Sequence, residues 1–518
     1  MSKVDWKIEG TIKLESQFKE VTARYGSNSE FNAVPLKNLT VKISAKESPL
    51  DPSFEKWGEV KTDDAGFFSL CILKDKSPRR FKIEVFFKND DFVIYPDNKG
   101  ILLTLAAGAA LAVGGLAGLA LEQTLVQTTK LAYDVDWFTI FQADSKEEER
   151  GPGNINFPKL RFRKGADYDL GDSVARKHAD IWFLYYKVKE YFASFSDNVG
   201  FLNERIAVKY PHNNSFVGED NEAPYASPYN NIIFIAVTKD FDGKKNDHKD
   251  DQAARDWCDV DTLLHELMHI WAYQHCTGEM SIAWQLIKHG STHEGLQAES
   301  FTAFHEGFAE WCSNRVYSAL FVSEKEPSKI YGELSDTGEP FNRKTLLDKG
   351  VLTVLEAERS EYAWISLFNM LCQWDLFRYT LNSNVAGDIH SNNDYVPKNT
   401  EHCSSPKAFF EDVLKVFKAA PDKGFPKILD KKEMNMDSFL KRFCAIVPGF
   451  SAADVGKYKI LIATEPNLPQ PHDLFCTANI KSKENNKPAP IPVRKENNKP
   501  SQLPIPKEGN KEVKKVKR

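Results

Sequence analysis

The strongest constraint on the fold comes from Asp261–Ile270, which reads Asp-Thr-Leu-Leu-His-Glu-Leu-Met-His-Ile. Its apolar residues recur at helical spacing, and Asp261 suits the N-cap position of a helix. Residues i and i+4 of a helix lie on one face, so His265 and His269 can aim their imidazole nitrogens at one point. A buried helix with two satisfied histidines is the alternative, but polar residues are rare in such an apolar run. The stretch therefore predicts a metal-binding helix.

Together with Glu266, the two histidines form the pattern His-Glu-x-x-His. Two histidines suit two of the three protein ligands of a catalytic zinc ion. Glu266 follows one step around the helix, where its carboxylate can take a proton from a water that zinc activates. The predicted cofactor is Zn²⁺, with His265 and His269 as ligands and Glu266 as the catalytic base.

A second motif, Phe304-His-Glu-Gly-Phe-Ala-Glu-Trp311, places Glu306 and Glu310 one helical turn apart. The two motifs together resemble those of the gluzincin metallopeptidases, over roughly residues 180–320. The resemblance implies that Glu306 is the third zinc ligand and that Glu310 orients a ligand histidine. The chain departs from the family in two ways: His305 stands where the family has Asn, and the segment between the motifs is about twice as long.

Other third ligands stay open. His265 to His275 nearly matches the metzincin pattern His-Glu-x-x-His-x-x-Gly-x-x-His. Ala272 stands where that pattern needs Gly for a left-handed turn. If the helix continues, His275 lies about 15 Å along the axis from His265, which favours Glu306. Two carboxylates before the second motif are further candidates, Glu294 and Glu299.

The composition is that of a globular protein, with 518 residues, 42% hydrophobic and 27% charged. This length predicts several domains. The net charge of −5 gives no indication of a nucleic-acid partner. The eight cysteines include no Cys-x-x-Cys pair, which argues against a zinc finger and a compact disulfide framework. The start of the chain lacks a signal-peptide pattern, so we expect synthesis in the cytosol, with membrane association or non-classical export left open.

Residues 1–144 are predicted to form a β-sandwich, because short alternating runs recur between turn clusters such as Thr62–Gly66. The predicted strands are Ile8–Ile12, Leu39–Ile43, Phe67–Cys71 and Phe81–Phe86. Their order resembles transthyretin-like and carboxypeptidase-regulatory-like modules. That resemblance implies an accessory or binding module without catalytic residues.

Ile101–Leu121 is an uncharged Gly/Ala-rich segment inside this module. A helix of this length can cross a hydrocarbon core of about 30 Å, and Gly114 and Gly118 have the spacing that lets helices approach closely in lipid. Three interpretations stay open: a membrane-inserting helix, a helix buried between domains, or a segment released at a membrane. A predicted strand at Ala132–Phe141 returns to the β domain and makes the segment an insertion.

Residues 145–175 are predicted to be a linker and 176–478 the metallopeptidase domain, with a helical C-terminal lobe. Before the first motif we expect a helix at Ala179–Phe192 and strands at Arg205–Tyr210 and Asn231–Val237. Ile232–Val237 is proposed as a free sheet edge for an extended peptide. The acidic loop 240–251 is expected to be solvated rather than a calcium loop. Candidates for stabilising an oxyanion are Tyr362, Tyr379 and His390.

The tail, 479–518, repeats Lys-Glu-Asn-Asn-Lys-Pro at 483–488 and 495–500. Its Lys, Pro and Asn predict a disordered basic segment with polyproline II character. Such a tail suits either contact with an anionic membrane or simple solubilisation.

The sequence as a whole predicts a multidomain α+β protein that acts as a zinc-dependent metallopeptidase on a protein or peptide substrate. A membrane-active or delivered toxin-like protein is the alternative, with Ile101–Leu121 inserting into a bilayer and the zincin domain as effector. A zinc-binding scaffold without catalysis is a third hypothesis. The substrate and the oligomeric state are not indicated.

Overall fold

The computed structural model describes residues 3–26, 33–47, 53–77, 79–95, 140–144, 153–162, 173–195, 199–212, 224–227, 231–237, 258–277, 300–321, 359–361, 364–365, 367–368, 406–418, 439, 443, 445 and 446. The chain divides into two compact units, Met1–Cys476 and Thr477–Arg518, and all described residues lie in the first. They form helices and three four-stranded sheets. The predicted tail lies outside the described residues.

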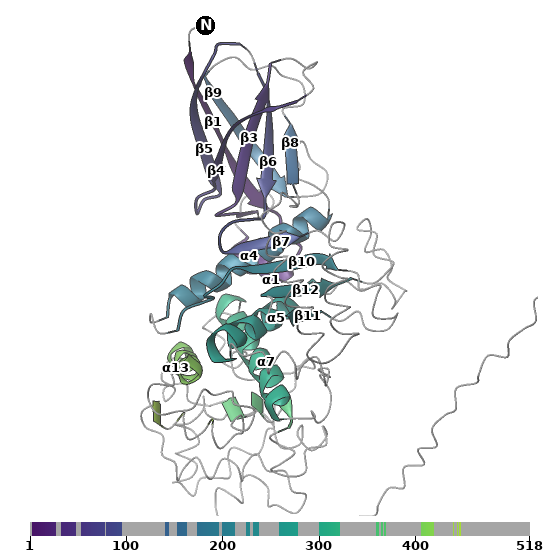
Figure 1. Ribbon diagram of the computed structural model, residues 1–518, viewed down its shortest axis with the longest axis vertical. Helices are drawn as coiled ribbons and strands as arrows, with labels where there is room; N and C mark the ends of the chain where they lie inside the picture. Colours follow the sequence, from purple (N-terminus) through teal and green to yellow (C-terminus); the bar gives the residue numbers. More distant parts are fainter. Residues whose placement is uncertain are drawn as a thin grey trace, which may run out of the picture. The chain divides into compact units, whose positions relative to one another are not determined.

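Two of the sheets are built from the N-terminal region (Figure 1). In the first, β1 (Val4–Leu14) pairs antiparallel with β2 (Val34–Pro35) and β5 (Phe67–Lys74), and parallel with β9 (Asn154–Phe162). The second has the order β4 (Glu55–Lys61), β3 (Thr40–Lys46), β6 (Arg80–Phe86), β8 (Ile140–Asp144). Side chains alternate between buried and more exposed along β1, and the buried ones join one core with those of β3 and β6. The four strands predicted here are all strands.

The predicted turn at Thr62–Gly66 is present between β4 and β5. The Asp63 carboxylate accepts hydrogen bonds from the backbone N–H groups of Ala65 and Phe67, at 2.9 and 2.8 Å. Gly66 has φ +72°, and a Cβ there would lie 2.4 Å from the carbonyl oxygen of Ile12. Glycine is therefore required both by the left-handed conformation and by the close approach of β1.

The linker prediction for 145–175 is wrong over β9, which pairs with β1 along seven residue positions between Lys7 and Leu14. Alternating apolar residues drive this pairing, since Ile155 and Phe157 are buried in the shared core. In the described part of the chain, β8 pairs with β6, so the chain returns to this sheet after the intervening segment. This return is expected if that segment is an insertion. Ile101–Leu121 and 132–139 lie outside the described residues. No helix in the described part of the chain is long and apolar enough to span a membrane.

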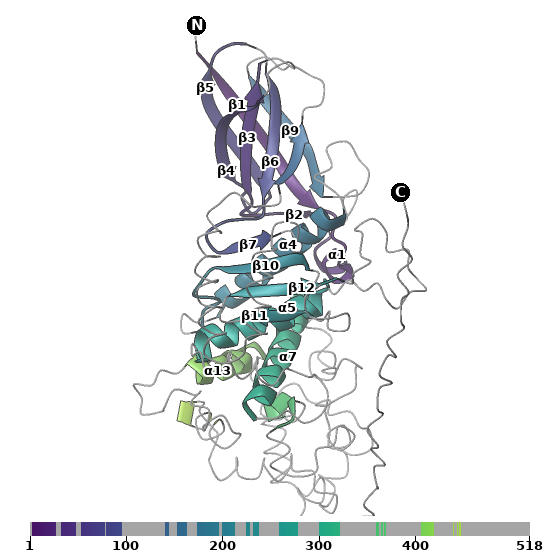
Figure 2. The same cartoon turned by 45° about the vertical axis from the view of Figure 1, so that its right-hand side comes forward.

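The third sheet has the order β11 (Tyr225–Ser227), β12 (Ile232–Ala236), β10 (Ile206–His212), β7 (Phe92–Tyr95), visible in Figure 2. β7 comes from the predicted N-terminal domain, so this sheet crosses the boundary placed at residue 144. β12 pairs with strands on both sides, and the prediction of Ile232–Val237 as a free edge is wrong. Its near-continuous apolar sequence is typical of an internal strand. Among the described strands, the edge beside β12 is β11.

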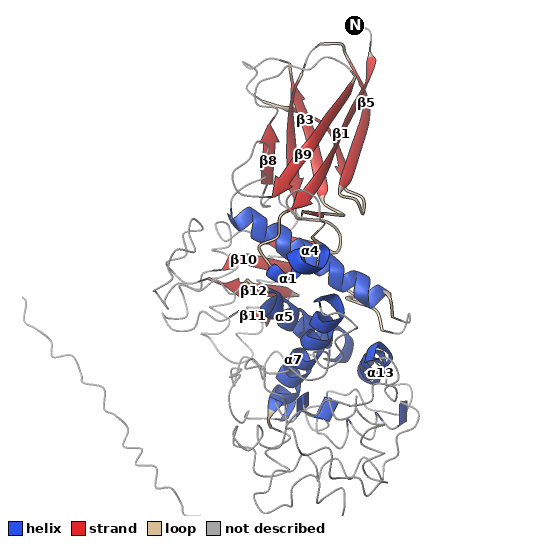
Figure 3. Ribbon diagram, turned by 180° about the vertical axis from the view of Figure 1, so that it is seen from behind, coloured by secondary structure: helices blue, strands red, loops and turns tan. Residues whose placement is uncertain are grey.

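Helix α4 (Ser173–Ala193) packs against β1 and β9 and buries a large aromatic surface, including Trp182 (Figure 3). Its buried Asp180 accepts hydrogen bonds from the Ser16 hydroxyl and from the backbone N–H of Gln17 at 3.0 Å. Asp180 thereby ties the end of β1 to α4. Burial raises the pKa of the Asp180 carboxyl to about 7, against the opposing effects of these two hydrogen bonds and of Lys177 and Arg176.

This raised pKa predicts a pH dependence of stability. The folded state binds the Asp180 proton more tightly than the unfolded state, whose carboxyl titrates near pH 4. The stability from this proton is fully present below about pH 4, falls as the pH rises, and is lost above the folded pKa of about 7. The loss is on the order of 4 kcal/mol, since one pKa unit is about 1.4 kcal/mol. Urea unfolding between pH 4 and pH 8 measures it, and the Asp180→Asn variant should lack this component. An equal slope in both proteins would contradict the assignment.

Candidate metal centre

The first motif lies on α5 (Val260–Ala272), whose buried residues include Leu264, Met268 and Trp271. Asp259 is the N-cap, and its side chain accepts a hydrogen bond from the Thr262 N–H at 2.8 Å. The cap predicted at Asp261 is therefore two residues too late, because Asp259 has the extended backbone that a cap requires. The helix continues directly into the π-helix η4 (Tyr273–Thr277).

The second motif lies on α7 (Ser300–Phe321), which packs against α5 (Figures 1 and 3). Gly307 follows Glu306 at a crowded point of this helix. A Cβ on Gly307 would lie 2.6 Å from the Glu361 carbonyl oxygen and 2.8 Å from the Trp364 Cβ. The missing side chain lets α7 approach the backbone of the later segment closely.

Replacing Gly307 with alanine is expected to destabilise the fold. Helix propensity alone would stabilise the variant by about 1 kcal/mol, whereas forced overlap costs about 1–3 kcal/mol. Because the overlap is with a backbone oxygen, which cannot rotate away, we expect a net loss of up to about 2 kcal/mol. Urea denaturation measures it. Ala319→Gly, at an exposed position of the same helix, reports the propensity effect alone. A Gly307→Ala protein more stable than wild type would show that the close approach is not needed.

Three side chains from the two helices meet at one place. The Nε2 atoms of His265 and His269 are 3.0 Å apart, and the Glu306 Oε2 lies 3.4 and 3.2 Å from them. Ligand atoms around a tetrahedral zinc with bonds of about 2.0–2.1 Å are separated by about 3.3 Å. Within the described part of the chain, this is the one group of His, Cys, Asp and Glu side chains spaced to hold a metal ion.

The hydrogen bonding of His265 fits this role. Its Nδ1–H donates to the Glu310 Oε2 at 3.1 Å. This bond at Nδ1 leaves Nε2 as the atom that faces His269 and Glu306, and the neutral ring with its proton on Nδ1 is the tautomer that binds a metal through Nε2. Glu310 therefore has the orienting position that the resemblance implies.

The electrostatics of the cluster also favour a cation. Burial lowers the pKa of His265, but hydrogen bonds to Glu306 and Glu310 outweigh it and raise that pKa well above its ordinary value. Burial raises the pKa of Glu306, but the charge of His269 and the hydrogen bonds from both histidines hold it well below its ordinary value. The Glu306 carboxylate, 3% exposed, is thus kept ionised beside two imidazoles. The donor set fits a metal ion, which would supply the positive charge that protons otherwise supply.

Glu266 lies beside these donors on α5 and is 5% exposed. Its negative charge contributes to the raised pKa of His265. His305, which precedes Glu306, is fully surrounded by protein. Burial, and secondarily the charge of His269, lower its pKa to about 3, so its ring is neutral.

His275 lies outside the cluster. Its Nε2–H donates to the Phe201 carbonyl oxygen, and its ring centroid lies 4.6 Å from that of Trp271, with the two ring planes tilted by 40°. The neighbouring Gln274 accepts a hydrogen bond from the Asn203 N–H at 2.7 Å, so η4 holds the loop before β10. The other sequence candidates, Glu294, Glu299, Tyr362, Tyr379, His390 and the loop 240–251, lie outside the described residues.

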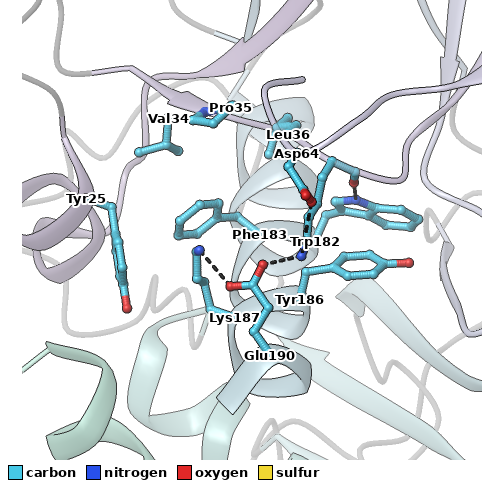
Figure 4. A pocket seen from close by; sticks show the side chains of 11 residues that line it. Tyr25, Val34, Pro35, Leu36, Asp64, Trp182, Phe183, Tyr186, Lys187 and Glu190 are labelled. Carbon is cyan, nitrogen blue, oxygen red and sulfur yellow. Dashed lines mark hydrogen bonds and ion pairs between the residues drawn. The ribbon is translucent and has the colours of Figure 1, made fainter. Parts of the chain in front are cut away.

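A pocket of about 320 Å³ between α4 and residues 34–37 is a second candidate site (Figure 4). Its aromatic walls are Tyr25, Trp182, Phe183 and Tyr186. Glu190 binds both Lys37 and Lys187, the latter at 2.8 Å, and Asp64 lies 3.7 Å from Lys37. The pocket therefore contains two positive and two negative side chains, and their charges cancel.

Sequence reasoning did not identify Asn314, whose Nδ2–H donates to the Glu310 Oε1 at 2.7 Å. Its spacing could have indicated it, because Asn314 lies four residues, or one helical turn, after Glu310.

Comparison of the chain with models of protein families, with curated proteins and with solved structures finds no match.

Proposed function

We propose that the protein is a zinc-dependent metallopeptidase whose metal is held by His265, His269 and Glu306. The observation that carries this proposal is the set of three facing donor atoms, 3.0–3.4 Å apart, with Glu310 fixing the tautomer of His265. Histidine and carboxylate donors suit zinc, and three protein ligands leave a fourth position for catalysis.

A bound zinc ion would supply a Lewis acid that lowers the pKa of a water from about 16 to about 7. Glu266 takes the proton from the attacking water and later delivers it to the leaving amine. The low exposure of Glu266 keeps bulk water from competing for that proton. His265 and His269 are held on one helix, so their spacing does not change as the proton moves.

The sheet edge that contacts α5 supports a peptide as the substrate. Among the described strands, β11 is the antiparallel edge strand of the third sheet, and it contacts α5. An extended peptide could add to this edge by main-chain hydrogen bonds, which select backbone rather than particular side chains. β11 takes the role that the sequence had suggested for β12.

Zinc content and proteolysis of the purified wild-type chain test the proposal. We expect about one zinc per chain by elemental analysis, cleavage of an unfolded protein such as casein, and loss of cleavage with a chelator that zinc restores. A chain that binds zinc but cleaves no peptide bond would support the scaffold hypothesis instead. A chain that binds no zinc would overturn the metal site itself.

The alternative, a membrane-active protein, is favoured by one sequence observation, the uncharged segment Ile101–Leu121. Co-sedimentation with liposomes of neutral and anionic lipid, for the full chain and for a variant lacking 101–121, tests it. Binding that requires the segment would support this function, and equal binding of both proteins would contradict it.

A further inference from the structure

The two carboxylate oxygens of Glu310 have different partners. Oε2 accepts from the Nδ1–H of His265 at 3.1 Å, and Oε1 accepts from the Asn314 Nδ2–H at 2.7 Å. The Asn314 amide also donates to the Glu310 carbonyl oxygen at 2.9 Å. One amide group therefore holds both the backbone and the carboxylate of the same residue.

Such an anchor matters because the last torsion of a glutamate side chain is only weakly restricted. The Glu310 side chain is 27% exposed, so water can compete for its oxygens. With Oε1 fixed by Asn314, the carboxylate plane is set and Oε2 points at the His265 ring. Without that bond, the carboxylate can turn toward solvent, and His265 loses the acceptor that selects its tautomer.

We propose that Asn314 is a positioning residue of the metal centre: it orients Glu310, which in turn orients the ligand His265. This inference rests on the proposed zinc site. Both hydrogen bonds of the Asn314 amide go to Glu310, and neither goes to His265, His269 or Glu306, so Asn314 acts through Glu310.

Ser313 provides a matched control. Its hydroxyl donates to the same Glu310 carbonyl oxygen at 2.8 Å, but no hydrogen bond joins it to the carboxylate. Ser313→Ala therefore removes a bond to the backbone of Glu310 and leaves the carboxylate anchored. Asn314→Ala removes both bonds. A purely structural role for Asn314 predicts that the two variants behave alike.

The experiment measures the zinc dissociation constant by competition with a chelator, the melting temperature of the metal-free protein, and the visible spectrum of the Co²⁺-substituted protein. Loss of an outer partner of a metal ligand costs about 10- to 100-fold in affinity. We expect Asn314→Ala to weaken zinc binding about tenfold and to change the Co²⁺ spectrum. Ser313→Ala should change neither, and both variants should melt within a few degrees of wild type.

A second pair of variants tests whether Asn314 acts through Glu310. In a Glu310→Ala background, Asn314→Ala should have no further effect on zinc affinity, because the residue through which it acts is gone. An effect of equal size in that background would overturn the proposal, as would wild-type zinc affinity in Asn314→Ala. If wild type binds no zinc, the proposed function fails and this inference with it. If wild type binds zinc and Asn314→Ala matches Ser313→Ala, the inference alone fails.

Discussion

Replacement of Glu266 by glutamine is expected to abolish peptide hydrolysis while leaving the metal in place. Glutamine has nearly the same shape but cannot accept the proton of the attacking water. General acid–base groups contribute about 10²- to 10⁴-fold to a rate. In the proposed mechanism Glu266 both accepts the proton of the water and donates it to the leaving amine. We therefore expect kcat to fall at least about 10³-fold, with zinc content and KM close to wild type. Steady-state kinetics on a fluorogenic peptide, with elemental analysis of the same samples, measures this.

Asp261→Asn is the control for this experiment. It removes a carboxylate from the first turn of the same helix, at an exposed position. Its turnover should match wild type. If Glu266→Gln retains most of its activity, Glu266 is not the base. If it loses zinc as well as activity, the carboxylate contributes to the metal site itself.

Replacement of Glu306 by alanine is expected to remove the metal. Oε2 of Glu306 is the donor that α7 adds to the two from α5, so the variant keeps only the histidine pair. The loss of zinc affinity should exceed the roughly 10- to 100-fold effect of losing an outer partner. Because a metal that binds only the folded state stabilises it, added zinc should raise the melting temperature of wild type and not of Glu306→Ala.

His275→Ala separates the two assignments of the third ligand. His275 hydrogen-bonds to the Phe201 carbonyl and lies outside the donor group, so this variant should keep about one zinc per chain. Zinc that is lost from His275→Ala and retained by Glu306→Ala would reverse the assignment.

The candidate metal centre could be predicted from sequence where the geometry depends on a single helix. His265 and His269 meet because they are four residues apart, and α5 needed only its apolar periodicity to be recognised. The distance between Glu306 and these histidines depends on how α7 packs on α5. No local pattern encodes that packing, and the prediction of Glu306 came from a resemblance.

Strand partners were harder to predict than strands. By its sequence alone, the segment of β9 resembles a polar linker. Its apolar residues Ile155 and Phe157 are buried because β9 pairs with β1. β12 was correctly predicted as a strand and wrongly predicted as a sheet edge. A run such as Ile-Ile-Phe-Ile predicts a buried strand but does not indicate which strands pair with it. Asn314 was missed for a related reason. Its importance depends on which way the Glu310 carboxylate faces, and this is a property of the folded side chain.

The position of β7 has a consequence for any shortened form of the chain. Phe92–Tyr95 precedes β10 by more than a hundred residues, yet among the described strands it is the outer strand of the sheet that contacts the helix carrying His265 and His269. A gene fragment that starts at residue 176 would lack this strand and leave the N–H and C=O groups of β10 open along one side, where another chain can pair. Expression of residues 176–518 alone is therefore expected to give a less stable chain that self-associates through β10.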